Sequence, residues 1–243
     1  MAIDFIAALR TEGSALASAA EAGPLVTAVP SCPGWTLADL VGHTGRIHRW
    51  ATVAATAGGE PAGRLPKAPD DLTQLLSWYD EGLEGLVAAL QATPADAPAW
   101  NFAGYRPATA AFWQRRQAQE TAVHRWDGEA ARGNASPIEA TLASDGIDEL
   151  MEFFSARRAA SVDGGITTGG TIHVHCQDTP GEWTFSCSGA DFTMSRGHIK
   201  GDVALRGTAS DLLLALWGRL GLDSLDVVGD RAVAERWLAP GMI

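Results

Sequence analysis

The chain has 243 residues, 46% of them hydrophobic, which is enough to bury one large core or two modest ones. Its formal net charge of −11 leaves no basic surface for a phosphate backbone, which excludes a nucleic-acid-binding protein. No stretch approaches the roughly 18 apolar residues of a membrane span, and the amino end lacks a secretory pattern. The three cysteines are too few for a disulfide framework. We therefore expect a cytoplasmic protein without a membrane partner.

Four helices are expected in residues 1–135. Apolar periodicity and stop signals place them at about residues 3–22, 36–57, 72–90 and 109–132. The start of the second is the best marked, because Thr36 can cap it and Asp39 stands three residues on, as in a capping box. Four helices with mostly modest connections predict an antiparallel bundle.

Residues 136–243 show a different pattern, which predicts a small α+β unit. The expected elements are a helix over about 138–160, a glycine-rich break at 163–170, a β-hairpin formed by 171–177 and 183–188, short strands at 192–196 and 203–206, and helices over 210–219 and 230–238. The fold class is therefore predicted to be α+β, with an amino-terminal four-helix bundle followed by a smaller α+β domain.

One register of the predicted hairpin gathers its apolar side chains on a single face. Pairing Cys176 with Trp183 places all six apolar residues of the two runs together. The same register puts His173 and His175 on the polar face, at the spacing of a strand metal site. Neither a carboxylate nor a third ligand accompanies them in the sequence, so we interpret this face as solvated.

The fourth helix carries a metal-ligand spacing. Glu120 and His124 are four residues apart and therefore share one helical face, with Asp127 one turn further on. His43 lies in the apolar stripe of the second helix, where an unpaired imidazole is costly, and can supply a third ligand. Two interpretations stay open from these residues. Either His43 is a core histidine and the largely polar stripe of the fourth helix meets solvent, or two helices build one site of two histidines and a glutamate. The stripe consists of Trp113, Arg116, Gln117, Glu120, His124 and Asp127.

Two neighbouring residues are assigned structural roles. His48 is five positions from His43, roughly 140° around the helix, so the two cannot be adjacent ligands. Cys32 lies just before the second helix among prolines, which is typical of a packed turn, and we do not assign it to catalysis.

Three segments carry a family resemblance: Val29 to His43, Glu120 to Asp127, and Gly207 to Arg219. They resemble the mycothiol-dependent maleylpyruvate isomerase family within the DinB-like metalloenzymes. The resemblance implies a DinB-like bundle in which His43, Glu120 and His124 are the metal ligands. It also implies a thiol cosubstrate, mycothiol, and a small anionic or electrophilic substrate.

The implied site has the chemistry of a catalytic zinc centre. Two neutral imidazoles, one carboxylate and Zn²⁺ leave a net charge of about +1 and an open position that a thiolate would neutralise. The thiol would add to an unsaturated substrate, giving cis-trans isomerisation or thiol transfer. Asp127 is a candidate to orient a ligand or move a proton, unless it is a surface aspartate, and Arg219 is a candidate anchor for the substrate. A metal-dependent hydrolase and a non-catalytic binding module remain alternatives, and the chain is expected to be a monomer or a homodimer.

Overall fold

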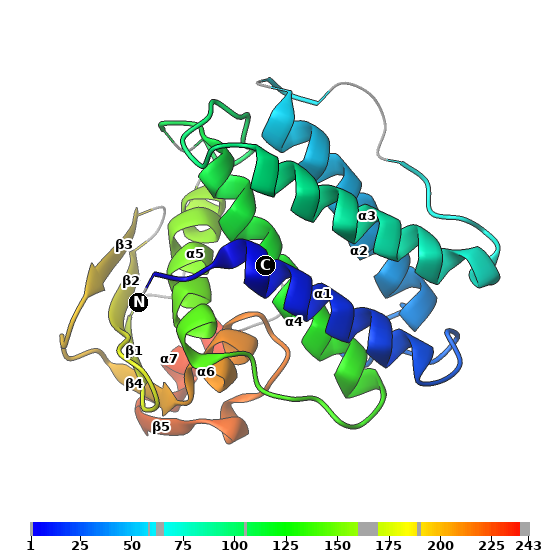
Figure 1. Cartoon of the computed structure of the whole chain (residues 1–243). Helices are drawn as coiled ribbons and strands as arrows, with labels where there is room; N and C mark the ends of the chain where they lie inside the picture. Colours follow the sequence, from blue (N-terminus) through cyan, green and yellow to red (C-terminus); the bar gives the residue numbers. More distant parts are fainter. Residues whose placement is uncertain are drawn as a thin grey trace. The chain divides into compact units, whose positions relative to one another are not determined.

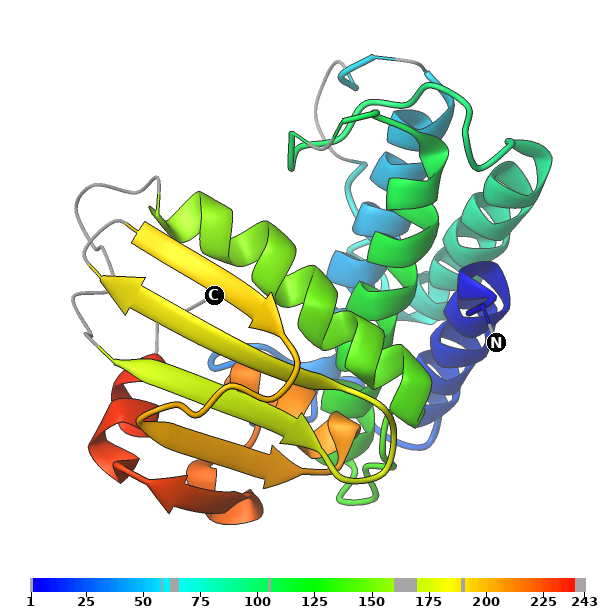
Figure 2. The same cartoon turned by 90° about the vertical axis from the view of Figure 1, so that its left-hand side faces the viewer.

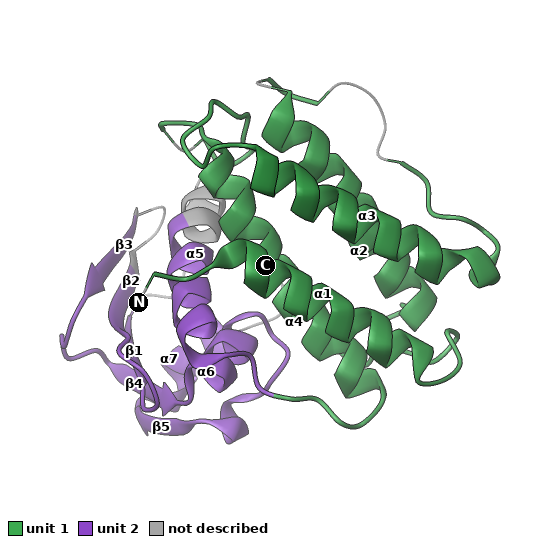
Figure 3. Cartoon of the chain, viewed as in Figure 1, with its two compact units in different colours: residues 1–136 green, residues 137–243 purple. Residues whose placement is uncertain are grey.

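The computed structural model describes residues 2–57, 59–61, 66–104, 106–159, 170–188 and 191–238. The chain divides into two compact units, residues 1–136 and 137–243 (Figure 3). The α+β fold class is confirmed, because unit 1 is helical and unit 2 combines helices with a five-stranded sheet (Figure 1). Among the described residues, no helix combines the length and the apolar character needed to cross a membrane.

The described residues of unit 1 form four helices close to the expected positions. They are α1 (Phe5–Glu21), α2 (Leu37–Thr56), α3 (Leu72–Ala92) and α4 (Ala110–Ala131). The expected capping box is present at the start of α2, where the Thr36 hydroxyl accepts from the Asp39 N–H and the Asp39 carboxylate accepts from the Thr36 N–H. This box satisfies two backbone donors that the helix itself leaves unpaired, and it defines the first residue of the helix that carries His43.

The helices of the bundle run in both directions. Gly42 lies against Leu75 and Gly45 against Trp78, so residue numbers rise together along α2 and α3 and these two helices are parallel. Helices α1 and α4 are also parallel, whereas α1 with α3 and α2 with α4 are antiparallel (Figure 1). The expected antiparallel order therefore holds for two of the four adjacent pairs. A parallel α2–α3 pair needs the long connection between Thr56 and Leu72, because the chain must return along a helix of about 30 Å before it starts the next one.

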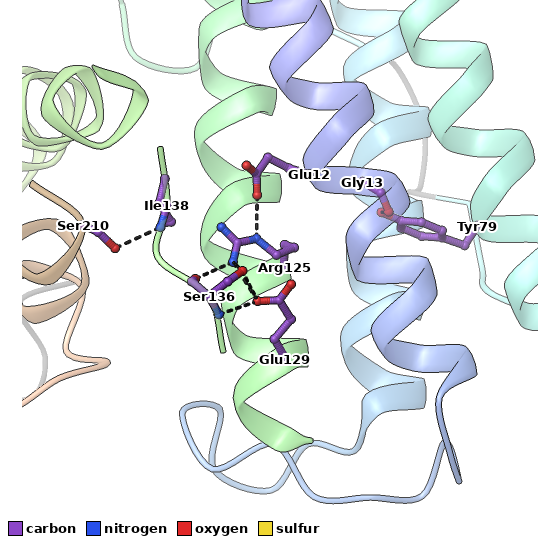
Figure 4. A network of polar contacts seen from close by, with 8 residues as sticks. All are labelled: Glu12, Gly13, Tyr79, Arg125, Glu129, Ser136, Ile138 and Ser210. Carbon is purple, nitrogen blue, oxygen red and sulfur yellow. Dashed lines mark hydrogen bonds and ion pairs between the residues drawn. The ribbon is translucent and has the colours of Figure 1, made fainter. Parts of the chain in front are cut away.

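A buried ion-pair network joins α1, α4 and the end of unit 1 (Figure 4). Arg125 is 3% exposed, and its guanidinium donates to Glu12 at 2.7 Å and to Glu129 at 2.8 Å. The same group donates to the Ser136 carbonyl at 2.6 Å, and the Ser136 N–H donates to Glu129. Burial opposes the charge on Arg125, but the two carboxylates outweigh that effect and raise its pKa. The charged form of Arg125 is therefore stabilised by its two carboxylate partners.

Unit 2 is a mixed sheet with helices on one face (Figure 2). Its elements are α5 (Ala140–Ala159), β1 (Thr171–Cys176), β2 (Glu182–Ser188), β3 (Asp191–Arg196), β4 (Val203–Gly207), α6 (Ala209–Leu216), a 3-10 turn (Leu222–Ser224), β5 (Asp226–Gly229) and α7 (Arg231–Trp237). The strand order is β3-β2-β1-β4-β5, and among the described strands only β1 and β4 pair in parallel. The edge strand β5 was not expected, because its four residues are too few to show an alternating pattern. Most of the predicted glycine-rich break, residues 163–169, lies outside the described residues.

The predicted hairpin of β1 and β2 is present, but its register is different. Trp183 pairs with Val174 and not with Cys176, a shift of two residues. Because two residues is the side-chain period of a strand, the apolar side chains still share one face. The Cys176 N–H donates to the Gly181 carbonyl at 2.9 Å and closes the hairpin there.

The connection from β3 to β4, residues 197–202, crosses the face of the sheet opposite the helices, which we call the outer face (Figure 2). We call this segment the crossing loop. The Thr184 hydroxyl donates to the Ile199 carbonyl at 2.9 Å, and Gly201 packs against the backbone of β1. The prediction of a solvated polar face is therefore wrong for His173, which is only 3% exposed beside this loop.

Candidate metal centre

Helices α2 and α4 bring His43, Glu120 and His124 together. The Nε2 atom of His43 is 3.6 Å from Oε1 of Glu120, and the rings of His43 and His124 are 5.3 Å apart, edge to face. One ligand atom from each residue lies within 4.8 Å of the other two. Ligand atoms around a tetrahedral Zn²⁺ are about 3.3–3.6 Å apart, given bonds of about 2.0–2.2 Å. The three side chains therefore fit a zinc ion after small adjustments.

The cluster is open on one side. The side chains of His43 and Glu120 are 24% and 22% exposed, and that of His124 is 12% exposed. A closed structural zinc site needs four protein ligands, whereas a catalytic site keeps a position for water or substrate. Three half-buried ligands match the second arrangement.

Glu120 is held in its ionised form. Its carboxylate accepts from Arg116 at 3.3 Å, and Arg116 is itself 3% exposed. Burial opposes ionisation of Glu120, but the neighbouring His43, Arg116 and His124 outweigh it and lower its pKa to about 2. A metal ligand must be deprotonated, so the carboxylate is ready to bind a cation at neutral pH.

Asp127 is buried and holds His124. Its side chain has no exposed surface, and its Oδ2 atom accepts from Nδ1 of His124 at 3.0 Å. With Nδ1 engaged in this way, Nε2 is the atom of His124 left to bind a metal. The surface-aspartate interpretation is therefore wrong.

Cys32 lies at the same carboxylate. Its thiol is 3.7 Å from Oδ2 of Asp127, and Cys32, His124 and Asp127 form a second possible donor group. The expected packed turn is present, because the Cys32 N–H donates to the Val29 carbonyl and the Trp35 N–H donates to the Cys32 carbonyl. The contact of Cys32 with Asp127 was not predicted from the sequence. The two residues are 95 positions apart, and only their inclusion in the segments of family resemblance connected them.

His48 is a structural residue, as expected. It has no exposed surface, and its Nε2 atom shares a hydrogen bond of 3.0 Å with the Thr121 hydroxyl. Burial lowers its pKa to about 3, so the imidazole is neutral at physiological pH.

Most of the polar stripe of α4 is buried, and only Glu120 and His124 are partly exposed. Arg116 is 3% exposed, Gln117 1% and Asp127 not at all. The stripe lines the interior of the bundle, and its charges are paired with one another. This arrangement is typical of a functional centre in a helix bundle.

Arg219 belongs to unit 2, just after α6. Its guanidinium donates to the Trp217 carbonyl at 2.8 Å and lies 5.9 Å from the Trp217 ring. Its role as a substrate anchor stays a prediction.

Comparison with known families agrees with both units. Residues 6–128 match the family "Mycothiol maleylpyruvate isomerase N-terminal domain", and residues 141–236 match the family "MDMPI C-terminal domain". A search of curated proteins found no match.

Two solved structures share the fold. One is a crystal structure of a point mutant of the mycothiol-dependent maleylpyruvate isomerase, with a TM-score of 0.63 and 13% identity over 92% of this chain and 91% of that one. The other is a crystal structure of the mycothiol-dependent maleylpyruvate isomerase, with a TM-score of 0.57 and 12% identity over 92% and 91%. Since the two family matches together cover most of the sequence, the chain belongs to the mycothiol maleylpyruvate isomerase family.

Proposed function

We propose that the chain is a zinc-dependent enzyme that uses mycothiol to isomerise, or to transfer a thiol to, a small unsaturated anion. The convergence of His43, Glu120 and His124 within 4.8 Å supports this proposal most strongly. The family to which the chain belongs supports the choice of thiol.

Thiol ionisation is the step for which the site is suited. A thiol with a pKa near 8.5 is only a few per cent ionised at pH 7, and forming the thiolate costs about 2 kcal/mol. Bound zinc supplies the positive charge that stabilises a thiolate at neutral pH. The residues of the chain set the strength of that charge: Glu120 contributes one negative charge, and the two imidazoles contribute none.

The reaction then needs only addition and elimination. A carbon–sulfur bond forms as the thiolate adds to a conjugated double bond, and the displaced electron pair moves onto the conjugated carbonyl group. The former double bond can now rotate. As the electron pair returns from the carbonyl group, elimination breaks the carbon–sulfur bond, restores the double bond in the trans form and releases the thiolate. If the adduct is protonated on carbon and released, the result is thiol transfer.

Two further residues have proposed roles. Asp127 orients His124 through the 3.0 Å hydrogen bond to Nδ1, which leaves Nε2 as the ring atom that would bind a metal. Arg219 would bind the carboxylate of the substrate, as a guanidinium does through paired hydrogen bonds. The substrate is a small molecule, and the proposal needs no nucleic acid or membrane.

The test combines metal content with turnover. We expect His43→Ala, Glu120→Gln and His124→Ala each to lose about one zinc per chain and to lose mycothiol-dependent turnover of maleylpyruvate. Glu81→Gln is the matched control, because this carboxylate lies on α3 and its side chain is 75% exposed. Unchanged zinc content in all three variants contradicts the metal site. Turnover without a thiol, such as hydrolysis of an amide, contradicts the thiol chemistry.

A further inference from the structure

Three histidines and one glutamate meet on the outer face of the sheet in unit 2. His173 and His175 come from β1, Glu182 begins β2 directly opposite His175, and His198 lies on the crossing loop. Oε1 of Glu182 is 2.9 Å from Nε2 of His173, 3.2 Å from Nδ1 of His175 and 2.6 Å from Nδ1 of His198. Three ring nitrogens therefore converge on one oxygen atom.

Hydrogen bonding alone accounts poorly for this arrangement. A carboxylate oxygen offers about two lone-pair sites, so three N–H donors exceed what one oxygen accepts well. Any imidazole that turns a bare nitrogen toward Glu182 places two lone pairs against each other. A cation at the centre of the cluster removes the conflict, because each of the four side chains then points a lone pair at the cation.

The distances suit such a cation. The four ligand atoms lie within 4.8 Å of one another, and the separations from Glu182 are 2.6–3.2 Å. The corresponding distance around tetrahedral Zn²⁺ is about 3.3–3.6 Å. A small outward movement of the exposed members is enough to admit the ion.

The cluster combines rigid support with access. His173 is buried in the middle of the sheet, and the crossing loop is held down by the bond from Thr184 to the Ile199 carbonyl. A Cβ atom on Gly201 would lie within about 3 Å of the β1 backbone, so a glycine here lets the loop lie flat. The side chains of His175 and His198 are 42% and 72% exposed, which leaves a route for the metal.

We infer that His173, His175, Glu182 and His198 form a second binding site for a divalent cation of the zinc type. Three imidazoles and one carboxylate favour borderline cations such as Zn²⁺ over Mg²⁺ or Ca²⁺, which prefer oxygen ligands. Four protein ligands close the coordination shell, so the role is structural: the ion ties the crossing loop to β1 and β2. This site shares no residue with the centre in unit 1 and does not depend on the proposed function.

The test uses the full chain and zinc alone, titrated against a chelating indicator. We expect His43→Ala with His124→Ala, which disables the unit 1 centre, to retain one zinc site per chain. Adding His175→Ala and His198→Ala should lower the remaining affinity at least about 100-fold, since loss of a mere supporting partner already costs about 10–100-fold. Zinc should also raise the Tm of the first variant but not of the second. Ser195→Ala, on the neighbouring strand β3, is the control.

Single variants decide whether all four ligands act together. We expect Glu182→Gln and His198→Ala each to weaken zinc binding in the same background. If both leave the affinity unchanged, zinc binds only the His173 and His175 pair and the four-ligand site is refuted. If the first variant takes up no zinc at all while its circular dichroism is native, the inference is wrong. His175→Ala with His198→Ala in the otherwise native chain should keep the zinc and the thiol-dependent turnover of unit 1, which separates this test from that of the proposed function.

Discussion

Replacing Asp127 with asparagine tests the support of the unit 1 centre without changing the size of the side chain. Asp127 has no exposed surface, and its carboxylate accepts from Nδ1 of His124 at 3.0 Å. Asparagine keeps one oxygen acceptor but removes the negative charge that makes this hydrogen bond strong. Water cannot replace the lost interaction, because the position is buried.

The expected loss is 10–100-fold in zinc affinity, about 1.4–2.7 kcal/mol, since removing the partner of a ligating histidine typically has that effect. The assay is competition with a chelator, which measures the affinity for the one zinc per chain that is lost in His124→Ala. Cys32→Ala is the matched comparison: it removes the 3.7 Å thiol contact with the same carboxylate, and a thiol is a weak donor, so we expect a loss of less than about tenfold. Equal affinities for Asp127→Asn and the parent, with native folding, would refute the reasoning.

Three further predictions concern stability. Arg125→Ala should lower the free energy of unfolding by about 3–5 kcal/mol, because it leaves Glu12 and Glu129 without their buried partner; a urea-unfolding difference under about 1 kcal/mol contradicts this. The folded pKa of His48, about 3, is below its unfolded value of 6.5, so the unfolded state binds more protons between these two pH values. The free energy of unfolding therefore falls as the pH falls through that window, by at most about 1.4 kcal/mol per pH unit. His48→Gln should reduce that slope, which urea midpoints at pH 7 and 4.5 would show, and an identical slope in the variant argues against it. Thr36→Ala should cost about 1 kcal/mol through loss of the capping box, seen as a lower Tm, and an unchanged Tm would mean that the box contributes nothing.

The local features were readable from the sequence because they depend on neighbours within a few residues. Apolar periodicity placed the helices of unit 1 to within a few residues, and the spacing of Thr36 and Asp39 identified the capping box. The four-residue separation of Glu120 and His124 placed both on one helical face. The role of His43 as their partner came from its apolar surroundings together with the family resemblance.

Contacts between distant segments were decided by the tertiary structure. The hairpin register was off by two residues, because a shift by the side-chain period keeps the same faces and the pattern cannot distinguish the two. The parallel direction of α2 and α3 depends on the course of a long connection, which periodicity does not record.

The two candidate metal-binding clusters show the same division most clearly. The sequence by itself determined which side chains have ligand chemistry and which of them share a helix or strand face. Only the tertiary structure placed Cys32 against Asp127, and only the crossing loop brought His198 to Glu182 and His173. A ligand set is complete when residues from separate segments meet at one point, and that meeting depends on how the elements pack and connect, which no local pattern encodes.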